Sequence, residues 1–99
     1  MDVSGTWNLI VDSPMGKQDV SLRVVADNGV LTGTLINNAY KMESEIFDGA
    51  VTDDRVQWKV KLQRAPVTLS FGGVVTGDTM TGSAKTGMFG KFAFSGRRI

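Results

Sequence analysis

The sequence predicts an all-β fold, an eight-stranded antiparallel up-and-down barrel that occupies residues 1–99 as a single domain. Three observations lead to this prediction. Apolar and polar residues alternate with a period of two along most of the chain, which is typical of strands with one buried face. No long stretch carries the apolar stripe of an amphipathic helix. Turn-forming residues recur at short intervals, so successive strands are expected to form hairpins.

The first half of the chain contains four expected strands, at residues 4–12, 18–26, 30–36 and 40–51. The first two show regular alternation, with apolar positions at Trp7, Leu9 and Val11 and at Val20, Leu22 and Val24. The third strand follows the turn signal Asp-Asn-Gly at 27–29, and the fourth follows Asn-Asn-Ala at 37–39. Short connections between them predict antiparallel neighbours.

The second half contains four more expected strands, at residues 55–63, 66–74, 79–85 and 91–98. Alternation is cleanest in the first of these, which carries Val56, Trp58, Val60 and Leu62. Val67, Leu69 and Phe71 mark the next strand, the third follows the turn signal at 76–78, and Phe92 and Phe94 mark the last. Closure of eight such strands into a barrel removes the exposed sheet edges, which favours a barrel over two stacked sheets.

An internal similarity divides the chain into two halves of four strands each. Residues 20–35 resemble residues 67–84, and each segment follows a strand that contains a tryptophan, Trp7 or Trp58. This pattern favours duplication of a four-strand unit. The alternative is chance similarity, because β proteins use Thr, Gly and Val repeatedly.

Composition excludes several classes of function. The chain has no Cys and no His, which excludes a disulfide framework, a thiolate nucleophile, His-based catalysis and the usual zinc ligands. The formal charge is +1, acidic and basic residues are interspersed, and no run of Lys and Arg is present. Nucleic acid is therefore not an expected partner, and neither a metal nor a cofactor is expected.

The location of the protein is predicted from what the sequence lacks. No apolar run is long enough for a membrane span, and no signal-peptide pattern follows Met1. A soluble, cytoplasmic location is the default expectation. A periplasmic or secreted location stays open if Met1 is not the natural start.

Two motifs resemble the calycin superfamily, which includes lipocalins, avidins and fatty-acid-binding proteins. Gly5 and Trp7 of "SGTW" match the Gly-x-Trp motif of the first calycin strand, and "LTGTL" at 31–35 is similar to an avidin motif. The resemblance implies a barrel base plugged by Trp7, with Arg97 or Arg98 packed over its indole. The chain is shorter than typical calycins, lacks long lid loops, and gives no basis for transferring biotin-binding residues. It is also similar to small β domains of uncharacterised bacterial proteins, some of which lie beside amidohydrolase-like domains.

Strand directions in such a barrel place alternate turns at opposite ends. The turns at 27–29, 52–54 and 76–78 are tight and polar, and Trp7 and Trp58 start their strands at that end. The turns at the other end contain Met15, Tyr40, Pro66, Met88 and Phe89. Apolar residues around one rim predict a ligand entrance or an association surface. The alternative is that these residues fold inward and cap a filled core.

The strand at 40–51 has two candidate orientations. One places Tyr40, Met42, Ser44 and Ile46 inside the barrel, and the other places Glu43, Glu45 and Phe47 inside. Hydropathy favours the first, whereas aligning Gly49 with Gly96 across the internal repeat favours the second. A bulge would serve both faces. A carboxylate inside an apolar barrel would be desolvated and would become a competent general base or acid.

The predicted function is binding of a small apolar or aromatic molecule in the open end of the barrel. The residues expected to line this site are Met15, Leu35, Tyr40, Met42, Leu62, Met88, Phe89 and Phe92. The first alternative is a cofactor-free isomerase, lyase or cyclase, with Glu43 or Glu45 as general base and Tyr40 donating a hydrogen bond to an oxyanion. The second alternative is a protein–protein interaction module, whose apolar rim docks a partner chain or forms a homo-oligomer.

Overall fold

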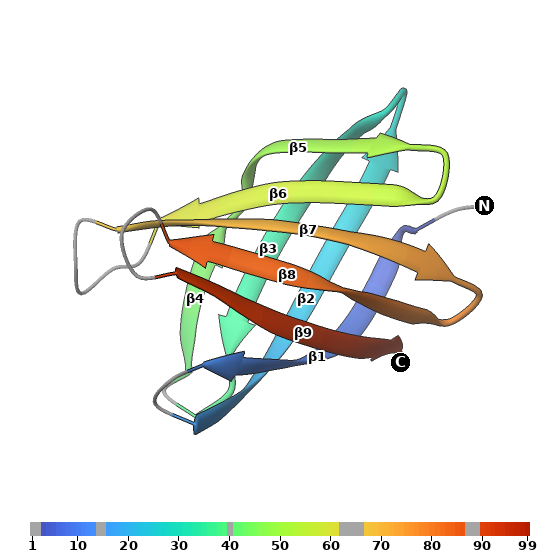
Figure 1. Cartoon of the computed structure of the whole chain (residues 1–99). Coiled ribbons are helices and arrows are strands. Elements are labelled where there is room, and N and C mark those ends of the chain that lie inside the picture. Colours follow the sequence, from blue (N-terminus) through green and yellow to red (C-terminus); the bar gives the residue numbers. More distant parts are fainter. Residues whose placement is uncertain (1–2, 14–15, 40, 62–66, 87–89) are drawn as a thin grey trace.

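The computed structural model describes residues 3–13, 16–39, 41–61, 67–86 and 90–99, and these residues form an all-β barrel (Figure 1). The expected strand at 40–51 is divided in two, so nine strands are described. In chain order they are β1 (Gly5–Ser13), β2 (Gly16–Asp27), β3 (Val30–Asn37), β4 (Met42–Glu45), β5 (Phe47–Thr52), β6 (Arg55–Lys61), β7 (Thr68–Thr76), β8 (Thr79–Thr86) and β9 (Gly90–Arg98).

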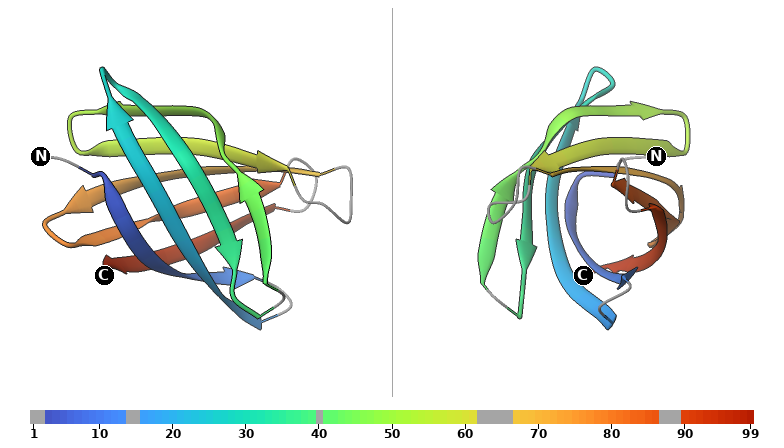
Figure 2. Two further views of the ribbon diagram at one scale, coloured as in Figure 1. Left: turned by 180° about the vertical axis from the view of Figure 1, so that it is seen from behind. Right: turned by 60° about the vertical axis from the view of Figure 1, so that its left-hand side comes forward.

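The strands form one closed antiparallel sheet, and Figure 2 shows the sheet curving round on itself. Apart from β4 and β5, which both pair with β3, each strand pairs with its neighbour in the chain. In addition β9 pairs with β1, and β5 connects the two halves by pairing with both β3 and β6. β4 and β5 occupy successive parts of one strand position against β3. The barrel therefore has eight strand positions, and the predicted fold class is confirmed.

A bulge near the start of β5 reverses the direction of the side chains. Phe47 lies opposite Lys59, but Ala50 lies opposite Gln57, so β5 contains one residue more than its partner. Asp48 takes up this extra residue with a positive φ of 51°. A bulge here was one of the outcomes that the sequence left open.

The bulge decides which face of β4 is buried. Ser44 lies opposite the buried Leu35, and Ile46 is buried, whereas Glu43 and Glu45 are exposed. The hydropathy pattern therefore predicted the right face. The prediction that Glu43 and Glu45 point inward is wrong, because the alignment with the second half does not allow for the inserted residue.

Apolar side chains from all the strand positions form the core. Trp58 stacks on Phe71, with ring centroids 5.1 Å apart and planes inclined by 8°. Phe94 contacts both rings edge-on, at centroid distances of 5.9 Å and 5.6 Å. Such offset and edge-on contacts are the favourable arrangements of aromatic rings. The largest fully buried side chains are Trp7, Trp58, Leu9, Leu22, Leu31, Met80 and Val60.

The pairing register repeats between the two halves of the barrel. Trp7 lies opposite Leu22 in the first half, as Trp58 lies opposite Phe71 in the second. Likewise Gly33 lies opposite Val24, and Gly82 lies opposite Gly73. The internal similarity seen in the sequence thus corresponds to equivalent positions in the barrel.

Interior glycines allow neighbouring strands to approach closely. A Cβ atom added to Gly82 would overlap the carbonyl oxygen of Gly72 and the Cα atom of Gly73, both in the adjacent β7. A Cβ atom added to Gly33 would likewise overlap the carbonyl oxygen of Arg23 and crowd the Cα atom of Val24, both in β2. Any larger residue at these positions would force the paired strands apart.

We therefore expect Gly82→Ala to lower the free energy of unfolding by about 3 kcal/mol, since the new methyl group has no space. Gly72→Ala is the matched control, because a Cβ there meets nothing closer than 4.0 Å, and its effect should stay below about 1 kcal/mol. Urea denaturation followed by tryptophan fluorescence measures both values. Equal transition midpoints for the two variants would contradict the close packing.

Candidate functional site

The two ends of the barrel differ in how they are closed. We call the end with the turns at residues 28–29, 53–54 and 77–78 the base, and the opposite end the mouth. β1, β3, β6 and β8 end at the mouth, whereas β2, β4, β7 and β9 begin there. Figure 1 shows the start of β1 and the end of β9 at the base.

A network around Trp7 closes the base. The Trp7 indole nitrogen donates a hydrogen bond to the carbonyl oxygen of Val3 at 2.9 Å. The guanidinium carbon of Arg98 lies 4.5 Å from the centroid of the Trp7 ring. Arg98 also donates from Nη1 to the Ser4 carbonyl at 2.7 Å and from Nε to Asp78 at 3.1 Å. The expected contact of Arg97 or Arg98 with Trp7 is therefore confirmed, and Arg98 makes it.

The register of the closing strands explains why Arg98 makes the contact and Arg97 does not. Trp7 of β1 lies directly opposite Arg98 of β9, so both side chains point to the same face of the sheet. Because side chains alternate along a strand, Arg97 points outward, and it is exposed. The base is thus sealed by side chains from the first and last strands.

Replacing Arg98 by Ala is expected to lower the free energy of unfolding by about 2 kcal/mol. The variant loses the cation–π contact with Trp7 and the charge-assisted hydrogen bond to Ser4. Arg97→Ala removes the same charge from the neighbouring residue and should change stability by less than about 0.5 kcal/mol. Chemical denaturation compares the two, and a loss of equal size in both would show that Arg98 does not hold the base.

Several interior side chains near the mouth are less completely buried than those in the middle of the barrel. Trp7, Leu9 and Leu22 have 0% of their surface exposed. Leu35, nearer the mouth, is 9% exposed, and three further inward side chains at this end are only partly buried, namely Met42, Leu69 and Phe92. Part of the apolar interior is therefore accessible to solvent at the mouth.

Among the described residues, two buried side-chain polar atoms have no hydrogen-bond partner. Trp58 is 1% exposed and Thr86 is 6% exposed, yet neither Trp58 Nε1 nor Thr86 Oγ1 forms a hydrogen bond. Thr86 is the last residue of β8, at the mouth. Buried polar groups usually have a partner, since leaving one unpaired costs free energy. Trp7, at the equivalent position of the first half, has a paired indole nitrogen. Trp58 lies in one row across the sheet with Phe71, Ala84 and Phe92.

The predicted site residues fall into three groups. Leu35, Met42 and Phe92 line the interior near the mouth, as expected. Met15, Tyr40, Leu62, Met88 and Phe89 lie outside the described residues, as does Pro66. Glu43 and Glu45 lie on the outer face, where solvent reaches them and the desolvation required for a general base is absent.

Trp58 and Thr86 are candidate site residues that the apolar pattern did not reveal. Trp58 fits the core pattern, and only its unpaired nitrogen distinguishes it from other core residues. Thr86 did carry a signal in the sequence, because it follows Met80, Gly82 and Ala84 on the inward positions of β8. A polar residue at the end of an apolar face is a candidate for a ligand contact.

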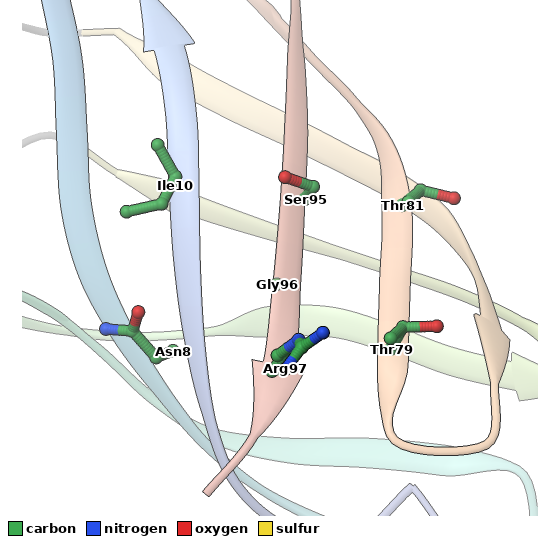
Figure 3. Close-up of a pocket in the computed structure, with 7 residues that line it drawn as sticks. All are labelled: Asn8, Ile10, Thr79, Thr81, Ser95, Gly96 and Arg97. Carbon is green, nitrogen blue, oxygen red and sulfur yellow. The ribbon is translucent and has the colours of Figure 1, made fainter.

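Two shallow hollows lie on the outer surface of the described residues. One, of about 330 Å³, is lined by Asn8, Ile10, Thr79, Thr81, Ser95, Gly96 and Arg97, from three adjacent strands (Figure 3). The other has a similar volume and lies beside the bulge, lined by Glu45, Ile46, Phe47 and Lys61. Both are broad and open to solvent, and neither holds an unpaired buried polar atom.

The described part of the chain offers neither a cluster of metal ligands nor a helix suited to a membrane. Within it, no group of three or more His, Cys, Asp or Glu side chains could hold a metal ion. The same residues form no helix of the length and hydrophobicity that crossing a bilayer requires. Comparison with known proteins gave no family model, no curated protein and no solved structure that matches the chain.

Proposed function

We propose that the protein binds a small, largely apolar molecule in the mouth half of the barrel. The observation that carries the proposal is the pair of buried, unpaired polar atoms, Trp58 Nε1 and Thr86 Oγ1. A ligand that reaches them would supply the missing hydrogen bonds while its apolar part stays in contact with the barrel interior.

The chemistry of the two groups defines the ligand. An indole nitrogen can only donate a hydrogen bond, whereas a threonine hydroxyl can donate or accept. The ligand therefore carries at least one acceptor, such as a carbonyl or ether oxygen. Its apolar part would pack on the partly buried side chains of Met42, Leu69 and Phe92. The site would then be apolar with a few polar groups that fix orientation, as is usual for small-molecule sites.

The base network supports entry from the mouth. Trp7 and Arg98 pack together at the base, so we infer that a ligand enters from the opposite end. The same contact supports the proposal that this is a calycin-like barrel, since Gly5, Trp7 and the terminal arginine are the residues that carry the resemblance. Binding of small molecules in the open end is what that resemblance implies.

The enzyme alternative finds less support. Glu43 and Glu45 were the candidate general bases, and both are exposed on the outer face of β4. Among the described residues, the interior positions carry no carboxylate that could replace them. Binding without chemical change is therefore the function we propose.

Thr86→Val tests the proposal because it removes only the hydroxyl and keeps the shape of the side chain. We expect it to weaken binding of Nile red, a neutral dye with a carbonyl acceptor, by about tenfold, the equivalent of one lost hydrogen bond. Without the dye the variant should melt at a higher temperature, since an unpaired buried hydroxyl is gone. Fluorescence titration measures the affinity and thermal denaturation measures the stability.

Thr81→Val is the matched control, since Thr81 is in the same strand but exposed on the outer face. It should leave dye affinity unchanged. Trp58→Phe keeps an aromatic ring against Phe71 but removes the indole N–H donor. It should also lower the affinity for Nile red. If wild-type protein takes up no dye, or if Thr86→Val and Trp58→Phe both bind it normally, the proposal is wrong.

A further inference from the structure

The acidic and basic residues are less evenly interspersed than we expected, because most acidic residues lie in the first half of the chain and most basic residues in the second. Residues 1–54 contain nine acidic and three basic residues. Residues 55–99 contain one acidic residue, Asp78, and eight basic residues. Figure 1 shows β6, β7, β8 and β9 side by side as one curved sheet, and no Asp or Glu lies within these four strands.

The register gathers lysines on the outer face of this sheet. Lys59 of β6 lies opposite Ser70 of β7, Ser70 lies opposite Lys85 of β8, and Lys85 lies opposite Lys91 of β9. Lys61 occupies the next outward position of β6. We call the exposed surface formed by Lys59, Lys61, Lys85 and Lys91 the basic face. It lies in the mouth half of the sheet.

The basic face contains a pairing that weakens the sheet. Lys85 and Lys91 are directly opposite each other, and like charges at such positions are destabilising. Among the described residues neither lysine has an acidic partner. Lys59 does have one, since it lies 3.8 Å from Asp48, but both side chains are largely exposed and such pairs contribute little. The repulsion between the two lysines would be reduced by a bound anion. The regular sheet around them therefore presents a surface suited to anion binding.

A strip of small residues lies beside the lysines. Gly72, Ser83 and Ala93 form the adjacent row across β7, β8 and β9. Their short side chains leave the backbone of the sheet accessible between the lysines and Arg55, which is exposed nearer the base. An extended chain can therefore lie across the strands with positive charges on both sides.

We propose that the basic face docks an extended, acidic segment of a partner polypeptide. Carboxylates two residues apart in an extended chain are about 7 Å apart, a spacing that flexible lysines can match. The acidic first half of the barrel would repel such a segment from the remaining surface and so direct it to β6–β9.

The described residues favour a peptide over single-stranded nucleic acid. The aromatic residues of β6–β9, which are Trp58, Phe71, Phe92 and Phe94, occupy inward positions. Single strands bind most proteins by stacking bases on exposed aromatic rings, and the basic face offers none. Carboxylates need only the charges and hydroxyls that this face provides.

The test measures the fluorescence anisotropy of a short labelled peptide of alternating Glu and Ser at low salt. We expect wild-type protein to bind it and the affinity to fall steeply as salt is added. Lys85→Glu should weaken binding at least tenfold. This variant places a carboxylate opposite Lys91, so its melting temperature should be equal to or above that of the wild type, which separates lost binding from lost folding.

Arg23→Glu is the matched control, since Arg23 is exposed on β2 and its replacement changes the net charge by the same amount. It should keep most of the peptide affinity. The proposal is overturned if the wild type does not bind the peptide, or if Arg23→Glu loses as much affinity as Lys85→Glu. Tighter binding of oligothymidylate, duplex DNA or phosphatidylserine vesicles than of the peptide would overturn it as well.

Discussion

The contact between Arg98 and Trp7 joins the two ends of the chain, and the barrel depends on it. Arg98 comes from the last strand and Trp7 from the first, so the contact holds the seam at which the sheet closes. The backbone adds to it, because Arg98 N–H donates to the Asp78 carbonyl and Ile99 N–H to the Thr6 carbonyl, each at 2.8 Å. With the seam closed, each strand has partners on both sides except around β4, and the sheet has few edges to protect.

The repeated register gives the barrel two similar halves, and the bulge at Asp48 is where they differ. Up to Gly49 and Gly96 the two halves place equivalent residues on equivalent faces. The extra residue turns Glu43 and Glu45 outward, while the equivalent end of β9 keeps Phe92 inward. The mouth is therefore asymmetric. One side has carboxylates on its outer surface, and the other has lysines.

Alternation predicted most of this fold because one face of nearly every strand is buried. In β6 the burial of Val56, Trp58 and Val60 follows the sequence pattern without exception. In the strand expected at 40–51 the hydropathy pattern indicated the buried face, but apolar residues occur on both faces and a bulge has no signature in a single sequence, so the other orientation also stayed open. The pattern also concealed the basic face, since Lys59, Lys85 and Lys91 are far apart in the chain and only the register brings them into one row.

Two consecutive residues at the end of β8 each lower the stability of the barrel. Lys85 points outward against another lysine, and Thr86 points inward with its hydroxyl unpaired. Either feature could be removed by a single substitution, Lys85 to Glu or Thr86 to Val, and both changes fit the local geometry. Sequences keep unfavourable features of this kind mainly where function requires them. Two on adjacent residues, on opposite faces of one strand, mark the mouth end of β8 as the place where the proposed ligand and the proposed acidic partner would both make contact.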